Sequence, residues 1–113
     1  MARDTYPREL EQTVLLALAA EGSEAQGGQV YDRIVETTGR DLSLAAVYIT
    51  LTRLEEKGWA EVRAAAPAAG QGGKPRKFYR LSEAGGLILN DARERFDALW
   101  RDAAGNPLVR RAE

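Results

Sequence analysis

The sequence predicts a mainly α-helical domain with one small β-hairpin, followed by a long C-terminal helix. Apolar residues recur at helical spacing in four separate stretches. Between the third and the fourth stretch, two short runs with strand character flank a segment of Ala, Gly and Pro. The 113 residues suffice for one domain with a modest core, and 44% hydrophobic and 29% charged residues are typical of a globular protein.

The first predicted helix runs from Pro7 to Glu21. Thr5 is a candidate N-cap, a proline is tolerated in the first turn, and Gly22 ends the helix. The apolar face consists of Leu10, Val14, Leu15 and Leu18.

The second predicted helix covers residues 27–38 and stops at Gly39, with Val30, Tyr31 and Ile34 inward. Two glycines, Gly27 and Gly28, weaken its start, so they either allow another backbone to approach closely or mark a loop. Only a few residues lead to the next helix, so the two helices are expected to cross as in a helix-turn-helix.

The third predicted helix occupies residues 42–58. Ser43 can serve as N-cap, Gly58 suits a left-handed position after the end, and Lys57 can face the negative end of the helix. The predicted core stripe is Leu44, Val47, Leu51 and Leu54. The opposite face carries Ala45, Ala46, Ile49, Thr52 and Arg53, with Tyr48 at its border. Because that face carries little charge, it is expected to meet another surface.

The hairpin is predicted from residues 59–65 and 76–81, with Tyr79 and Leu81 closing the core. Its loop carries the cations Lys74, Arg76 and Lys77, which could reach phosphates. The alternative is a hairpin that simply faces solvent.

The last predicted helix starts after the cap Ser82 and runs to about Ala103, roughly 30 Å. Its apolar stripe contains Ile88, Ala92, Phe96, Leu99 and Ala103, broadened by Leu87 and Trp100. A small domain cannot easily cover such a stripe, so we predict a homodimer that buries Leu15, Ile88, Ala92, Phe96, Leu99 and Trp100. In the alternative, the helix folds back on its own domain.

This order of elements is that of a winged helix-turn-helix with an added C-terminal dimerisation helix. The predicted divisions are residues 5–81 for the winged helix-turn-helix, 82–104 for the dimerisation helix, and 105–113 for a flexible tail.

Positive charge is concentrated in the middle of the chain, although the net charge is only −1. Residues 42–81 hold 7 basic and 3 acidic side chains, whereas residues 1–41 hold 4 basic and 8 acidic ones. A local basic patch on a nearly neutral protein can bind phosphate groups.

The absence of Cys and His excludes disulfides, thiolate zinc sites and catalysis by Ser-His or Cys-His pairs. No acidic pair stands out, so we expect no enzyme, no metal and no cofactor. The sequence has neither an apolar secretion signal at its start nor a run long enough to span a membrane, which favours the cytoplasm.

Three segments resemble the PadR family of bacterial transcription regulators. They are LEQTVLLAL near the start, DLSLAAVYITLTRLEEKGW in the third helix, and GGKPRKFYRLSEAG in the wing and its exit. The resemblance is strongest over residues 8–86 and favours the short members with a single C-terminal helix.

The resemblance implies a homodimeric repressor on a pseudo-palindromic operator, with helix 42–58 in the major groove and wing 66–77 on the DNA backbone. The predicted DNA-binding residues combine the positions that the resemblance implies with the outward face of the third helix. They are Ser43, Ala45, Ala46, Tyr48, Ile49, Thr52, Arg53, Lys74, Arg76 and Lys77. Many members have Gly-Thr where this chain has Ala45-Ala46, which leaves contact with thymine methyl groups as a substitute.

Two further functions remain open from the sequence. The interpretation we favour for Phe96 and Trp100 is that they are aromatic residues of the dimer core. The alternative, which the resemblance implies, is that flat hydrophobic effectors stack on them, and the protein would then sense or carry such molecules. Alternatively, Ile49 and the alanines dock a protein partner, since no Lys or Arg precedes Arg53 on the third helix.

Overall fold

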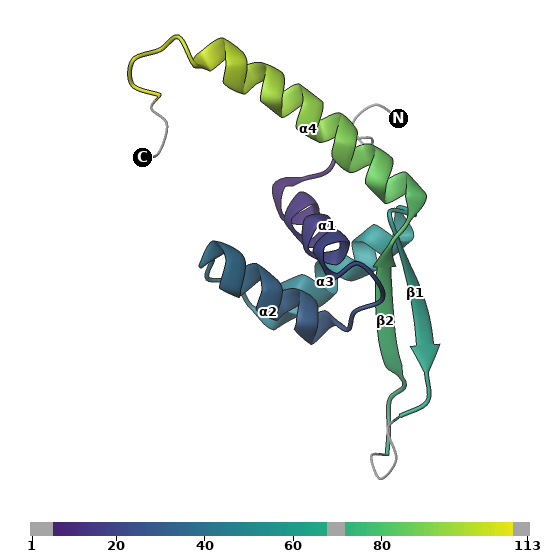
Figure 1. The fold of residues 1–113 in the computed structure, drawn as a ribbon. Helices are drawn as coiled ribbons and strands as arrows, with labels where there is room; N and C mark the ends of the chain where they lie inside the picture. Colours follow the sequence, from purple (N-terminus) through teal and green to yellow (C-terminus); the bar gives the residue numbers. More distant parts are fainter. Residues whose placement is uncertain (1–5, 68–71, 110–113) are drawn as a thin grey trace.

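The computed structural model describes residues 6–67 and 72–109. Figure 1 shows three helices and an antiparallel hairpin forming the body, with a fourth helix leading away from it. The elements in order are α1 (Glu9–Glu21), α2 (Gly27–Thr38), α3 (Leu44–Glu56), β1 (Ala60–Ala65), β2 (Arg76–Leu81) and α4 (Glu83–Ala103). The predicted fold class is confirmed. The candidate cap Thr5 lies outside the described residues.

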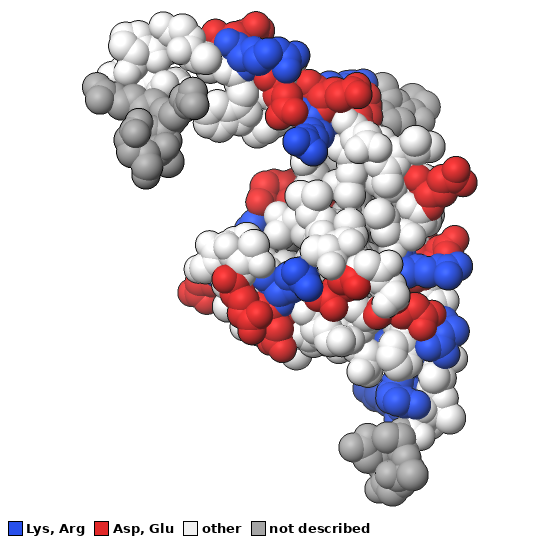
Figure 2. Space-filling view, in the orientation of Figure 1, with Lys and Arg blue, Asp and Glu red and all other residues white. Residues whose placement is uncertain are grey.

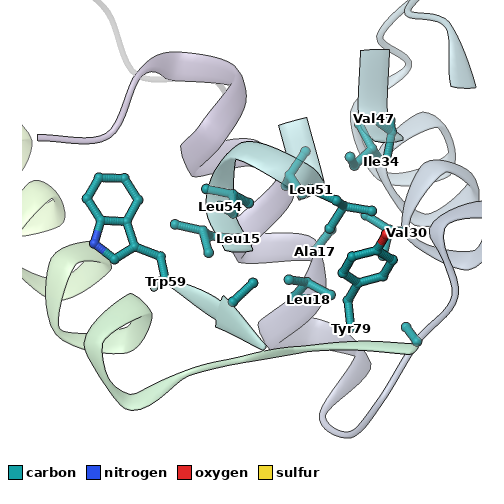
Figure 3. Close-up of a cluster of buried hydrophobic side chains, with 13 residues drawn as sticks. Leu15, Ala17, Leu18, Val30, Ile34, Val47, Leu51, Leu54, Trp59 and Tyr79 are labelled. Atoms are coloured by element: carbon teal, nitrogen blue, oxygen red, sulfur yellow. The ribbon is translucent and has the colours of Figure 1, made fainter. Parts of the chain in front are cut away.

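One core joins the three helices to the hairpin (Figure 3). Leu15 and Leu18 from α1 meet Leu51 and Leu54 from α3, and all four side chains are fully buried. Tyr79 of β2 closes the core on the hairpin side, as the sequence predicted. Its amide donates to the carbonyl of Ala25 at 2.8 Å and its carbonyl accepts from the Ala25 amide at 2.9 Å, so the loop after α1 is tied to β2.

Helix α1 begins at Glu9, two residues later than predicted, because the chain before it is extended. The Arg8 amide donates to Oε1 of Glu11 at 2.8 Å, and the Lys57 ammonium donates to Oε2 at 2.7 Å. Lys57 therefore pairs with Glu11 and also lies over the Trp59 ring, a role that the sequence did not predict for it.

Helix α3 has the predicted cap, since the Ser43 hydroxyl accepts from the Ala46 amide at 3.0 Å. The predicted core position of Leu44 is wrong, because the first turn of α3 extends past the core and leaves this side chain 43% exposed. Thr50 lies on the buried face instead, and its hydroxyl donates to the Ala46 carbonyl at 2.8 Å. This bond satisfies the polar atom inside the core.

Strands β1 and β2 pair in one register from Ala60↔Leu81 to Ala65↔Arg76. Side chains alternate between the two faces of a strand. Lys77 therefore lies on the same face as buried Tyr79, and Arg76 lies on the opposite face with Phe78.

The start of α4 is fastened to the corner between α3 and β1. The Ser82 hydroxyl accepts from the Gly85 amide at 3.0 Å, as expected of the predicted cap, and donates to the Gly58 carbonyl at 2.6 Å. Gly58 has the predicted positive φ, 80°.

Only the first half of α4 covers its own domain. Ile88 and Leu89 pack against the core and Ala92 is 1% exposed, whereas Phe96, Leu99 and Trp100 lie open to solvent. Leu15 and Ala92 were predicted to lie in the dimer interface. That prediction is wrong for both residues, because each is buried within its own chain and cannot contact a second protomer. The first half of the apolar stripe of α4 therefore packs on its own domain, as the alternative prediction had it, and the second half is exposed.

Residues 104–109, which follow α4, form turns, and the rest of the predicted flexible tail lies outside the described residues. The Asn106 amide donates to the Ala103 carbonyl at 2.9 Å, and the Val109 amide donates to the Asn106 carbonyl at 3.0 Å. In the described part of the chain, no helix has the length and apolar character needed to cross a membrane.

Candidate nucleic-acid interface

The outward face of α3 presents mostly small and apolar side chains. Ile49 is 56% exposed and Tyr48 is 41% exposed. The structure places Ser43, Ala45, Tyr48, Ile49, Thr52 and Arg53 at the surface, with Ala46 half-buried.

The hydroxyls of Ser43 and Thr52 already have partners in the backbone of α3. The Ser43 oxygen accepts from the Ala46 amide, and the Thr52 hydroxyl donates to the Tyr48 carbonyl at 3.1 Å. The Thr52 oxygen therefore keeps its lone pairs for an outside donor, while Arg53 remains a donor only. The face can combine apolar contact with a small number of polar contacts.

The cations of the wing lie at the far end of the hairpin. Figure 2 shows blue atoms on the hairpin directly before its grey tip. Lys74 and Lys77 are exposed, and the Arg76 guanidinium donates to the Ala66 carbonyl at 3.0 Å and lies 5.6 Å from the centre of the Phe78 ring. Part of the predicted wing, residues 68–71, lies outside the described residues.

Ion pairing separates the seven cations of residues 42–81 into two groups. Three are neutralised at 2.7 Å each: Lys57 by Glu11, Arg63 by Glu24 and Arg80 by Glu61. Within residues 6–67 and 72–109, the other four have no carboxylate at ion-pair distance. These four are Arg53, Lys74, Arg76 and Lys77. We call them the free cations, and all four are among the predicted DNA-binding residues.

The paired cations show why the sequence alone overstated the basic region. Arg63 on β1 reaches back 39 positions to Glu24, and no local pattern signals such a pair. The hydrogen bond from Arg63 holds the pKa of the Glu24 carboxyl below its usual value, so the carboxylate stays ionised and cancels that charge at neutral pH. Among the cations of residues 42–81, those left without a carboxylate partner in the described part of the chain therefore lie only on the wing and at the end of α3.

A second candidate site lies on the open half of α4. Phe96, Leu99, Trp100, Ala103 and Val109 line a hollow of about 270 Å³, and all five side chains are apolar. The two aromatics predicted as a ligand site are thus brought together.

The sequence-based interpretation of α1 missed Leu16. This side chain is 57% exposed and lines a hollow between α1 and α4 together with Leu89 and Phe96. Leu16, and not Leu15, is therefore the leucine of α1 that lies at the surface. The run VLLALAA is apolar on all sides, so periodicity could not separate the two leucines.

Comparison with known proteins gives one family. Residues 15–91 match the model of the Transcriptional regulator PadR-like family. No curated protein sequence matches the chain.

Three solved structures illustrate the similarity of the fold. A PadR-like transcription factor from Bacteroides fragilis has a TM-score of 0.70 at 20% identity, with 84% of this chain and 86% of that chain covered. A PadR-like transcriptional regulator from Bacillus cereus has a TM-score of 0.66 at 19% identity, covering 90% and 93%. Bacillus subtilis PadR in complex with operator DNA has a TM-score of 0.60 at 23% identity; it covers 94% of this chain, which spans 50% of the longer PadR chain.

Proposed function

The chain belongs to the PadR-like family of transcriptional regulators, and from this premise we propose that it binds double-stranded DNA through α3 and the wing. The observation that carries the proposal is the position of the free cations, Arg53 on α3 and Lys74, Arg76 and Lys77 on the wing. The similar fold of Bacillus subtilis PadR, solved with operator DNA, supports it.

In this proposal, α3 enters the major groove and selects the sequence. The groove is wide enough for a helix, and methyl groups such as those of Ala45, Ala46 and Ile49 can contact thymine methyls. Arg53 can donate to a base edge or a phosphate. Ser43, at the start of the helix, and Tyr48, at the border of the face, are proposed to lie near the DNA backbone. Thr52 is proposed to lie on or beside the side that faces the DNA.

The wing supplies affinity that does not depend on sequence. Lys74, Arg76 and Lys77 would neutralise phosphates and release counterions, which makes binding weaken steeply as salt rises. Residues 5–81 are the proposed DNA-binding unit.

Dimerisation through residues 82–104 completes the proposed regulator. The open half of α4 exposes Phe96, Leu99 and Trp100, and Leu16 adds apolar surface from α1. A two-fold axis at this surface would present two α3 helices to a pseudo-palindromic site with half-sites about one helical turn apart. We propose that the dimer acts in the cytoplasm and represses transcription by occupying such a site near a promoter.

A charge-removal experiment tests the DNA-binding proposal. The triple variant Lys74→Ala, Arg76→Ala, Lys77→Ala should bind the DNA upstream of its own gene at least about 100-fold more weakly at low salt, since it loses three phosphate contacts per protomer. The matched control removes the same charge from α4 by Arg93→Ala, Arg95→Ala, Arg101→Ala and should bind within about threefold of wild type. Equal losses in both variants would contradict the proposal.

A second candidate function is the sensing of a flat hydrophobic effector. The apolar hollow that contains Phe96 and Trp100 favours it, because ring stacking and burial need no charged partner. Ethidium should quench the emission of exposed Trp100, and Trp100→Phe should remove that response while buried Trp59 still emits. Unchanged emission at saturating dye would contradict effector binding here.

A further inference from the structure

We propose that Gly27 is a positioning residue for sequence choice, because it is the position on α2 that lets the Tyr48 ring settle beside the outward face of α3. Gly27 itself would touch no DNA. The inference rests on the proposed binding of DNA through α3, and it adds a residue from a different helix to the determinants of specificity.

The contact leaves no room for a side chain at position 27. A Cβ built on Gly27 would lie 2.4 Å from Cε1, 2.5 Å from Cζ and 2.9 Å from Oη of Tyr48. These separations are far below van der Waals contact, so either the ring or the helix would have to move. The φ angle of Gly27 is not in the left-handed region, so its backbone conformation would accept another residue. The Tyr48 ring is therefore the reason that only glycine fits at this position.

The ring is the part that would yield. Val47, Leu51 and Leu54 are completely buried and hold the inner side of α3 in the core. Tyr48 is instead 41% exposed, with free space on its outer side. A methyl group at position 27 would therefore push the ring outward, towards its helical neighbours Ala45 and Thr52. The shape of the proposed DNA surface would change while every charge on it stayed in place.

This geometry separates two components of binding. Base selection depends on how closely α3 fits the groove, whereas non-specific affinity depends on phosphate contacts from the wing. A Tyr48 ring pushed outward would hold α3 farther from the base edges. It should therefore reduce the preference for the correct DNA, while the wing keeps binding to unrelated DNA almost unchanged. A general loss of folding would weaken both.

The neighbouring glycine provides a matched control. Gly28 lies in the same first turn of α2, and a Cβ there would meet nothing within 4 Å. Gly28→Ala therefore makes the same chemical change and has the same effect on helix propensity, without touching Tyr48.

The experiment uses the full chain and two duplexes. One carries the DNA immediately upstream of the protein's own gene, and the other has the same composition in scrambled order. Gly27→Ala should lower affinity for the upstream duplex about tenfold, the size of one lost base contact, and change affinity for the scrambled duplex less than about twofold. Gly28→Ala should match wild type on both.

A second comparison tests whether the effect passes through the ring. In the Tyr48→Ala background there is room for a methyl group, so adding Gly27→Ala should change affinity for either duplex less than about twofold. This comparison also decides the matter if Gly27→Ala alone fails to fold, because the double variant is free of the clash.

Three outcomes would overturn the inference. They are equal affinities of Gly27→Ala and Gly28→Ala, an equal loss on both duplexes, and a further tenfold loss in the Tyr48→Ala background. In each of these cases wild type still prefers the upstream duplex, so only this inference fails. If wild type itself shows no preference, the proposed function fails together with it.

Discussion

Glu11 is a buried carboxylate on which three segments of the fold depend. It is 3% exposed, accepts from the Arg8 amide at the start of α1, and pairs with Lys57 after α3. Burial raises the pKa of Glu11, but the hydrogen bonds from Lys57 and the Arg8 amide outweigh it and hold the pKa below the ordinary value of 4.5. The ionised form is therefore the one that stabilises the fold.

Replacing this carboxylate should destabilise the protein in a pH-dependent way. Glu11→Gln leaves Lys57 without its partner, so the free energy of unfolding should fall by about 1–3 kcal/mol at neutral pH. Because the folded pKa is lowered, the contribution is present above pH 4.5 and is lost as pH falls through the folded pKa. Urea unfolding at neutral pH and at about pH 3 should show the difference from wild type shrinking in acid.

Glu9 supplies the control for that experiment. It pairs with Arg40 at 2.7 Å but is largely exposed, so Glu9→Gln should lower the free energy of unfolding by less than about 1 kcal/mol. A loss for Glu11→Gln no larger than this, or one that stays constant in acid, would contradict the role given to Glu11.

Single residues were predictable where their role is local. The caps Ser43 and Ser82 and the left-handed Gly58 each depend on positions within one turn of the helix, and the structure confirms all three. Lys57 and Glu11 lie 46 positions apart, and their pairing depends on how α1 packs beside α3. Sequence patterns carry no signal for such a distance.

At the scale of elements, the joint between the proposed DNA-binding unit and α4 is tightly packed. A Cβ on Gly85 would lie 2.1 Å from the Trp59 carbonyl oxygen, and the Ser82 hydroxyl binds the Gly58 carbonyl in the same corner. Movement at the start of α4 would therefore reach the end of α3 directly.

Filling this joint should be costly. Gly85→Ala places a methyl group against a backbone atom that cannot rotate away, so the free energy of unfolding should fall by about 1–3 kcal/mol. That loss corresponds to a fall in Tm of at least about 4 °C, measurable by circular dichroism.

Gly86 provides the neighbouring control on the same helix. Its nearest contact would be a Leu81 methyl group at 3.8 Å, an ordinary packing distance. Gly86→Ala should therefore raise the free energy of unfolding by up to about 1 kcal/mol. Equal Tm values for the two variants would contradict the prediction that a methyl group at position 85 clashes with the Trp59 carbonyl and destabilises the protein.

Periodicity predicted the elements well but not what covers them. The bounds of α4 and β2 agree with the sequence, and α1 differs by two residues at its start. The apolar stripe of α4 is continuous in sequence, yet Ala92 is buried on its own domain while Leu99 is open. Spacing defines a helical face, and only the fold decides which neighbour that face meets.

At the scale of the whole molecule, α4 makes a single protomer elongated. The structure measures 59 × 35 × 21 Å, and its radius of gyration is 16.5 Å, against about 13 Å for a compact chain of this length. Figure 1 shows the C-terminal half of α4 reaching away from the body. Its open aromatic surface is what we propose a second protomer covers.

Polar substitution on that surface should dissociate the proposed dimer. Leu99→Ser with Trp100→Ser removes two large apolar contacts per protomer and should weaken self-association at least about 100-fold, observed by sedimentation equilibrium. Leu108→Ser changes a residue that is 84% exposed beyond the helix and should leave association unchanged. A wild-type protein that sediments as a monomer would contradict the dimer.

The central claim is that the free cations hold α3 against DNA, and the salt dependence of binding by the wild-type protein tests it most directly. Affinity for the duplex upstream of its own gene should be measured by fluorescence anisotropy between about 50 and 200 mM salt. Each neutralised phosphate contributes about −0.9 to the slope of log affinity against log salt, so four free cations predict about −4 for one protomer and about −7 for a dimer. Binding that does not change with salt, or no binding at the lowest salt, would contradict the account.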